Sequence, residues 1–268
     1  MPPNRLLSSL RQGRPIIGTS FDTQDELVAE SLSSTGLDFI DIDMQHGAVT
    51  IDGLRRALMA LRATGLPTIV RPLWNDPPVV GQILDLGADG LIVPMVNSAE
   101  EARRAVAATR YPPTGTRSWG PFRAAALHGG DEAYMRDAND SIAVFVQVET
   151  VEAVKNLDAI LSVTGLNGVV IGPADLAISL GYGHDRQNRA VLDTMQSVLD
   201  RCLERGVPFG LYAGSVEIGA YWLERGGLVI ACCGFSTFIA EGVSRLSAEL
   251  GSVRDRLASR RADQQPDG

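Results

Sequence analysis

Ala-Val-Phe-Val-Gln-Val-Glu at residues 143–149 and Gly-Val-Val-Ile-Gly-Pro-Ala-Asp at residues 168–175 decide the fold of this chain. Each stretch begins with an apolar, β-branched run that is typical of a buried parallel strand. Each ends in a carboxylate, Glu149 or Asp175, at the strand edge where a (β/α) barrel builds its active site. Alone, either residue could simply cap a helix or a turn. Together, two carboxylates facing one opening predict a site for a hard divalent cation.

Six more runs of the same kind extend this pattern along the chain. The eight predicted strands are residues 15–21, 39–44, 68–71, 90–95, 143–149, 168–171, 208–213 and 228–234. Helical spacing separates them, most clearly at residues 51–64, at 98–109 with a capping box from Ser98 to Glu101, and at 215–225. Eightfold alternation of strand and helix predicts a closed parallel (β/α)8 barrel rather than an open doubly wound sheet.

Length and composition agree with one barrel domain spanning residues 1–268. The chain has 268 residues, of which 45% are hydrophobic, and barrels of about 250 residues are single domains. The net charge of −8 argues against a nucleic-acid or anionic-membrane partner. No signal peptide, no membrane span and no disulfide framework among three cysteines are evident, so we expect a cytoplasmic protein.

Two segments interrupt the alternation. The connection at residues 111–140 opens with a rigid, non-helical Pro- and Gly-rich run, and its aromatic residues favour a function or an interface. Arg117 and Arg123 in this connection either clamp an anionic substrate or are solvated. The polar tail at residues 258–268 is predicted to be flexible.

Polar residues collect at the predicted strand ends. Arg71 could pair with a substrate carboxylate or with negative charge on a keto oxygen. His46 has a reference pKa suited to proton transfer, and Asp43 could orient its imidazole. The bland alternatives are a structural histidine, a salt-bridged arginine, a loop-capping aspartate and, for Gln147, a satisfied polar group inside the barrel. Glu149 and Asp175 would hold Mg²⁺ or Mn²⁺ and leave positions open for a 2-oxo acid.

These residues occur within an ordered set of motifs that resembles the HpcH/HpaI aldolases, the metal-dependent (class II) pyruvate aldolases. The resemblance covers nearly the whole chain, from Ile17-Gly18 to the helix after Gly234. The motifs are Leu37-Asp38-Phe39-Ile40-Asp41-Ile42-Asp43-Met44-Gln45-His46, Val70-Arg71-Pro72, Ile83-Leu84-Asp85-Leu86-Gly87-Ala88, Ile92-Val93-Pro94-Met95-Val96, Arg110-Tyr111-Pro112-Pro113, Val146-Gln147-Val148-Glu149 and Ile171-Gly172-Pro173-Ala174-Asp175-Leu176.

The resemblance implies a barrel of the phosphoenolpyruvate/pyruvate type whose last helix is swapped between subunits, in a hexamer built as a trimer of dimers. It implies reversible cleavage of a 4-hydroxy-2-oxo acid to pyruvate and an aldehyde, through a pyruvate enolate stabilised by Mg²⁺, Mn²⁺ or Co²⁺. The implied metal ligands are Glu149 and Asp175, and the implied catalytic residues are His46, Arg71, Asp43 and Asp85, with Asp85 at a subunit interface. The expected substrate contacts are Arg71, Gln147, Gly172, Pro173, Ala174, Asp175 and Leu211. No Schiff-base lysine is needed, and the single lysine, Lys155, falls in a predicted helix.

The chain departs from the family pattern at positions that, in the family, line the aldehyde side of the pocket or the interface. Gln45 precedes the histidine where many relatives have Glu, and residues 19–21 and 234–237 also differ. The aldehyde is therefore open among semialdehydes, lactaldehyde, glyceraldehyde and larger aromatic or sugar aldehydes. Two other functions remain alternatives: a lyase acting on a CoA thioester, like the citrate lyase β subunit, and a non-catalytic barrel.

Overall fold

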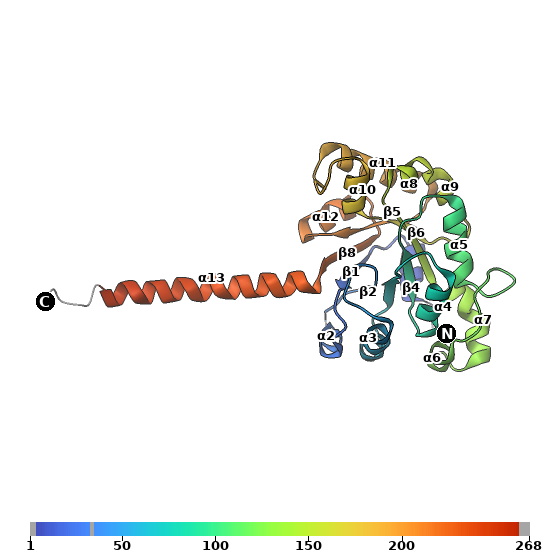
Figure 1. Cartoon of the computed structure of the whole chain (residues 1–268), viewed down its shortest axis with the longest axis horizontal. Coiled ribbons are helices and arrows are strands. Elements are labelled where there is room, and N and C mark those ends of the chain that lie inside the picture. The colour runs from blue at the N-terminus through green and yellow to red at the C-terminus, as the bar shows by residue number, and fades with distance from the viewer. Residues whose placement is uncertain (1–3, 33–34, 263–268) are drawn as a thin grey trace.

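Eight parallel strands close into a barrel in which each strand pairs with the next and β8 returns to β1 (Figure 1). The computed structural model describes residues 4–32 and 35–262. The strands are β1 Ile16–Phe21, β2 Phe39–Asp43, β3 Thr68–Arg71, β4 Gly90–Val93, β5 Ala143–Val148, β6 Gly168–Ile171, β7 Phe209–Ala213 and β8 Val229–Gly234. All eight predicted strands are present, and their ends differ from the prediction by at most two residues.

Helices alternate with the strands, and most of them surround the barrel, including the three whose ranges the sequence predicts. They are α1 Arg5–Arg11, α2 Glu26–Ser31, α3 Ile51–Thr64, α4 Pro77–Asp85, α5 Ala99–Thr109, α6 Phe122–Leu127, α7 Asp131–Ser141, α8 Val151–Lys155, α9 Leu157–Leu161, α10 Pro173–Ser179, α11 Arg189–Arg205, α12 Val216–Glu224 and α13 Phe235–Ala262. The predicted (β/α)8 class is confirmed.

The helix caps explain why the predicted helix ends were accurate. The hydroxyl of Ser98 accepts a hydrogen bond from the backbone N–H of Glu101, and Ser215 does the same for Ile218. The capping box at Ser98 is only half formed, because the Glu101 carboxylate accepts from the N–H of Asn97 instead of that of Ser98.

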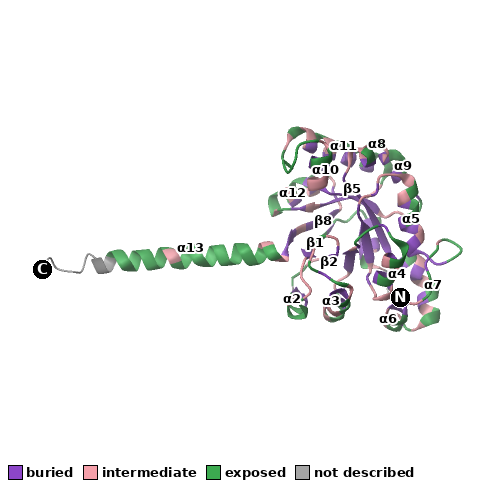
Figure 2. Ribbon diagram, viewed as in Figure 1, coloured by how far each residue is buried: buried purple, intermediate pink, exposed green. Residues whose placement is uncertain are grey.

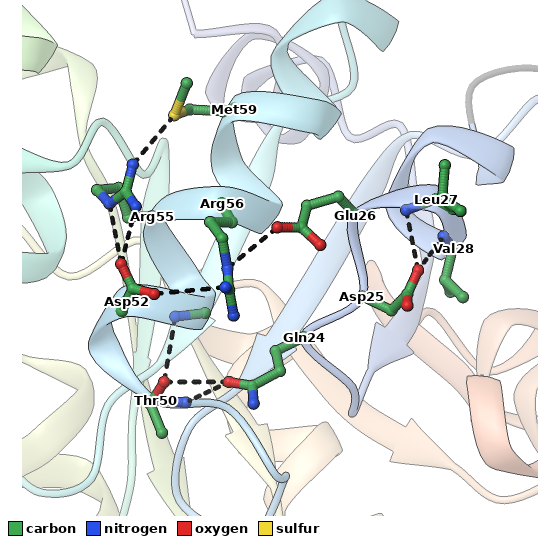
Figure 3. Close-up of polar contacts among 11 residues, drawn as sticks. Gln24, Asp25, Glu26, Leu27, Val28, Thr50, Asp52, Arg55, Arg56 and Met59 are labelled. Atoms are coloured by element: carbon green, nitrogen blue, oxygen red, sulfur yellow. Dashed lines mark hydrogen bonds and ion pairs between the residues drawn. The ribbon is translucent and has the colours of Figure 1, made fainter.

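Polar contacts link α2 and α3, the helices that follow β1 and β2 (Figure 3). Asp25 caps α2 by accepting from the N–H groups of Leu27 and Val28. Arg56 of α3 reaches across to Glu26 at 3.0 Å, and Gln24 bonds the hydroxyl of Thr50 at the start of α3. These side chains are largely exposed, so they orient the helices more than they stabilise them.

Helix α1 closes the amino-terminal end of the barrel. Leu6, Leu7 and Leu10 pack against apolar residues of the barrel interior. The side-chain amide of Asn4, which also caps α1, donates to the backbone oxygens of Asp89 and Ser141 at 2.9 and 2.7 Å. With this end sealed, the interior opens at the carboxyl ends of the strands, where the predicted site residues lie.

The long connection at residues 111–140 is not a structureless loop. Its first part is non-helical as predicted, but α6 and α7 fill the rest. Tyr111, Trp119 and Tyr134 form an aromatic cluster around the guanidinium of Arg117, which lies 4.7 Å from the centre of the Tyr111 ring. This packing orders the connection.

Helix α13 corrects the expectation of a flexible tail from residue 258. It continues through residues 258–262, while residues 263–268 lie outside the described part of the chain. The helix projects away from the barrel and is almost entirely exposed after its first turn (Figures 1 and 2). No helix in residues 4–32 and 35–262 is long and apolar enough to cross a membrane.

Candidate active site

All eight strands contribute to a cavity of about 340 Å³ at the carboxyl ends of the barrel. Its walls contain most of the residues that the sequence predicts for the site. They are Asp43, His46, Arg71, Gln147, Gly172, Pro173, Ala174 and Asp175. A larger cavity of about 1090 Å³ lies between α4 and residues 116–123, outside the barrel and away from these strand ends. The smaller cavity is therefore the candidate active site.

Arg71 and Asp43 form a two-pronged ion pair between the ends of adjacent strands. Nε of Arg71 donates to Oδ1 of Asp43 at 2.9 Å, and Nη2 donates to Oδ2 at 2.6 Å. Burial alone would raise the pKa of Asp43, but the hydrogen bonds and charge of Arg71 outweigh it and hold that pKa below its usual value. Asp43 is thus an anion that fixes the direction of the guanidinium.

His46 lines the cavity with an exposed side chain. Its backbone N–H donates to Oδ1 of Asp43 at 3.2 Å, and the N–H of Gln45 donates to the same oxygen at 2.9 Å. Among the described residues, the imidazole has no hydrogen bond to the Asp43 carboxylate. The expectation that Asp43 orients the imidazole is therefore not met, because this carboxylate is already engaged by Arg71 and by the loop backbone.

Glu149 is buried at 2% exposure directly after β5. Oε1 accepts from the N–H of Met95 at 2.8 Å, whereas Oε2 has no hydrogen-bond partner among the described residues. Burial, and further the charge of Asp175, raises the pKa of Glu149 to about 7. The backbone of Met95 is strained, with φ 56° in the left-handed region. In this conformation its N–H donates to Oε1 of Glu149.

The Glu149–Asp175 pair fits a divalent cation. A buried, unpaired carboxylate oxygen beside a second carboxylate is costly alone and is compensated by a metal ion. No group of three or more His, Cys, Asp or Glu side chains in residues 4–32 and 35–262 is arranged to hold a metal. The pair would therefore supply two oxygen-bearing side chains and leave the other coordination positions to water and substrate.

Gly172 is required by its closeness to these side chains. A Cβ at this position would lie 2.1 Å from Oε2 of Glu149 and 2.7 Å from Nε2 of Gln147. Gln147 is 5% exposed, and its Oε1 has no partner among the described residues. Only glycine allows both side chains to turn toward the cavity here.

Two predicted residues lie elsewhere. Asp85 pairs with Arg117 at 2.7 Å in the cavity outside the barrel, so within one chain it does not join the other site residues. The prediction that Leu211 lines the site is wrong. Side chains alternate along β7, and that of Leu211 points outward into the apolar layer between the barrel and the helices. Its neighbour Tyr212 lines the cavity in its place.

The sequence reasoning missed four polar residues of the cavity, Asp22, Asp41, Arg186 and Tyr212, whereas Ser20 lies within residues 19–21, which it had noted. A signal for Asp41 was available, since it lies two residues before Asp43 and so on the same face of β2. Arg186 lies in an irregular loop after α10, where no periodicity could have indicated it. Lys155 lies in α8 and does not line the cavity.

Comparisons with known proteins agree with this architecture and identify the family. Residues 21–239 match the family described as HpcH/HpaI aldolase/citrate lyase. The chain is 37% identical to a 4-hydroxy-2-oxo-heptane-1,7-dioate aldolase of Salmonella arizonae over 252 residues, 94% of this chain and 96% of that one.

Two solved structures extend the similarity. An HpcH/HpaI aldolase/citrate lyase family protein from Burkholderia cenocepacia J2315 superimposes with a TM-score of 0.88 at 31% identity, covering 92% of this chain and 99% of that one. The citrate synthase SbnG superimposes with a TM-score of 0.81 at 29% identity, covering 94% and 98%. The chain thus belongs to the HpcH/HpaI aldolase/citrate lyase family, a family of carbon–carbon lyases.

Proposed function

We propose that this protein is a metal-dependent aldolase that reversibly cleaves a 4-hydroxy-2-oxo acid to pyruvate and an aldehyde. One observation carries the proposal: Arg71, Gly172 and Asp175 line one barrel-mouth cavity, and the buried, unpaired Oε2 of Glu149 lies next to Gly172. The two carboxylates could bind a metal cation, and the positive charge of Arg71 could bind an anionic substrate. The aldolase activity named for the relative in Salmonella arizonae supports the same reaction class.

Glu149 and Asp175 would hold Mg²⁺, Mn²⁺ or Co²⁺. When bound, such an ion would act as a Lewis acid that stabilises negative charge on the keto oxygen of pyruvate. The ionised pair is also less costly with the ion present, because their mutual repulsion is then compensated. Gln147 and residues 172–174 would form the wall against which the 2-oxo acid lies.

Arg71 would hold the 2-oxo acid. Asp43 takes its Nε and Nη2, so Nη1 is the nitrogen left to donate to the substrate carboxylate or keto oxygen. Because the guanidinium is held at both of its other nitrogens, little rotational freedom is lost when substrate binds. Its positive charge would stabilise the enolate that forms during cleavage.

His46 would transfer the proton of the C4 hydroxyl group. In the cleavage direction the hydroxyl proton leaves, the C3–C4 bond breaks, and its electron pair becomes the pyruvate enolate. Protonation of C3 then gives the methyl group of pyruvate. His46 lines the cavity, and among the described residues its imidazole donates no hydrogen bond to the Asp43 carboxylate, so the imidazole would be available to take and return a proton.

We also propose that the protein assembles as a hexamer, a trimer of dimers, with α13 packed against a second copy. Exposed apolar residues recur on α13 at alternating steps of four and three, which is the spacing of a helix-packing seam. They are Ile239, Val243, Leu246, Leu250, Val253 and Leu257. On the barrel, the outward-facing Ile17 of β1 is 39% exposed, whereas outward residues of neighbouring β2 are fully buried. A helix from a second copy could cover this uncovered strand.

The test measures pyruvate release from a 4-hydroxy-2-oxo acid in an assay coupled to lactate dehydrogenase. We expect release to stop in EDTA, to return with Mg²⁺ or Mn²⁺, and to be lost in Glu149→Ala. Metal-independent release, or full activity in Glu149→Ala, would refute the proposal. Turnover of a CoA thioester without aldol cleavage would instead favour the citrate-lyase-like alternative, and failure to bind a cation in calorimetry would favour a non-catalytic barrel.

A further inference from the structure

Asp41 is a buried carboxyl group to which the proposed reaction gives no role. It is 7% exposed and lines the barrel-mouth cavity, and its Oδ1 has no hydrogen-bond partner among the described residues. Burial raises its pKa to about 7, although the nearby charge of Arg71 acts in the opposite direction. A buried polar atom without a partner destabilises the fold. Because Oδ1 of Asp41 lies beside a cavity, a ligand in that cavity could supply the missing hydrogen bond.

Asp41 lies on the side of the cavity opposite the proposed metal ligands. Glu149 follows β5 and Asp175 follows β6, while Asp41 belongs to β2. In a closed ring of eight strands, β2 is opposite β6 and β1 is opposite β5. Pyruvate held between Arg71 of β3 and the carboxylates that follow β5 and β6 would leave the side of β1, β2 and β8 for the second substrate, the aldehyde.

The neighbours of Asp41 on this side are also polar. Ser20 of β1 is directly paired with Asp41 in the strand register, and Tyr212 of β7 lines the same cavity. Burial raises the pKa of the Tyr212 phenol, and the charges of Asp22 and Asp41 add to the effect. Hydroxyl and carboxyl groups therefore line the aldehyde side, where an apolar substrate would leave them unpaired.

From this arrangement we propose that Asp41, with Ser20 and Tyr212, selects aldehydes that carry a hydroxyl group next to the carbonyl carbon. The inference rests on the proposed aldolase function and names the substrate class of its second half. The substrate hydroxyl donates to Oδ1 of Asp41 and supplies the missing partner. An aldehyde without that hydroxyl leaves the carboxyl oxygen unpaired, and one with a distal carboxylate places a further acidic group beside Asp22 and Asp41.

Arg186 marks the competing possibility. It is the other arginine that lines the cavity, and it could pair with an anionic aldehyde. Its side chain is exposed, however, and it also lines the adjacent cavity beside α12, so its charge is shared with solvent. The buried, unpaired oxygen of Asp41 is the stronger determinant, because a group that water can reach loses little without a ligand.

The test compares matched aldehydes with the Mg²⁺- or Mn²⁺-loaded enzyme and pyruvate, in the direction of aldol addition. The pairs are glycolaldehyde with acetaldehyde and glyceraldehyde with propionaldehyde, and succinic semialdehyde serves as the anionic member. We expect kcat/KM to favour the hydroxylated member of each pair by about 10- to 100-fold, the scale of a hydrogen bond to a charged or buried group. Equal values within the pairs would overturn the inference.

Two substitutions locate the effect. Asp41→Leu should abolish the preference by lowering kcat/KM for the hydroxylated aldehydes alone, while Asp41→Asn, which keeps an acceptor oxygen, should retain most of it. Deuterium exchange into the methyl group of pyruvate, which involves no aldehyde, should continue in both variants. A preference that survives Asp41→Leu would refute the role of Asp41, and dominance of succinic semialdehyde that is lost in Arg186→Gln would assign selection to Arg186. Absence of both exchange and aldol product in the unsubstituted enzyme would instead refute the aldolase function itself.

Discussion

Asp43 holds Arg71 through two parallel hydrogen bonds, at 2.9 Å from Nε and 2.6 Å from Nη2. Under the proposed function, this pairing would turn Nη1, the nitrogen that neither bond uses, toward the substrate. Lysine keeps the charge but cannot make the two parallel bonds and still donate in a fixed direction. We therefore expect Arg71→Lys to lower kcat/KM for the 2-oxo acid by about 10²-fold, the scale of losing one oriented oxyanion donor. Steady-state kinetics measure it, and a change of less than twofold would show that the pairing has no role in catalysis.

Gly172→Ala should damage the cation site specifically. The added methyl group would lie 2.1 Å from Oε2 of Glu149, so the carboxylate must move. We expect affinity for Mn²⁺, measured by calorimetry, to fall by about tenfold or more. Gly81→Ala is the matched control, because nothing lies within 4 Å of its Cβ and it is inside helix α4. The control should bind Mn²⁺ normally and be more stable by about 0.5–1 kcal/mol. Equal affinity in both variants would contradict the packing argument.

Asp41→Asn should stabilise the protein in a pH-dependent way. The folded-state pKa of Asp41 is about 7, against 3.8 for an ordinary exposed aspartate, so between these values the folded protein holds a proton that the unfolded chain has released. Its contribution to stability therefore falls as pH rises through this window and is most unfavourable above pH 7. The neutral amide avoids the penalty, giving an expected gain on the order of 2–4 kcal/mol at pH 8 and progressively less toward pH 5. Urea unfolding at several pH values measures it, and a pH-independent difference would argue against a raised pKa.

The apolar seam of α13 should control assembly. Leu246→Glu combined with Leu250→Glu places two charges in the seam, and we expect the mass measured by light scattering to fall from that of an oligomer toward that of one chain. Ala248→Glu is the control, since it lies on the opposite face of the same helix and should leave the mass unchanged. An unsubstituted protein that is already monomeric would exclude the proposed assembly.

The barrel could be predicted from the sequence because its strands are buried on both faces. Continuous apolar runs such as residues 143–146 indicate a strand without tertiary information, and serine caps such as Ser98 mark where helices begin. Arg71 and Glu149 could be located for the same reason, since a polar residue that ends or directly follows such a run must lie at the strand end. His46 and Asp175 follow their strands within four residues and so lie at the same end of the barrel.

What could not be predicted depends on contacts between distant segments. Helices α6 and α7 were missed because α6 has only six residues and α7 is mostly polar, so neither has a clear helical periodicity and both depend on packing near Tyr111 and Arg117. The partner of Asp43 could not be derived either, since Arg71 and the loop backbone compete for the same carboxylate. Leu211 was assigned to the wrong face of β7. Its neighbour Tyr212, one residue further along the strand, faces the cavity instead.

The most direct measurement is deuterium exchange into the methyl group of pyruvate. Proton NMR monitors this exchange in D₂O with no aldehyde present. Exchange reports formation of the pyruvate enolate, which is the step that Glu149, Asp175 and Arg71 are proposed to support. We predict that exchange needs Mg²⁺ or Mn²⁺, is abolished by EDTA, and falls to the uncatalysed rate in Glu149→Ala. Exchange that continues in EDTA, or that is unchanged in Glu149→Ala, would contradict a site built on the two carboxylates.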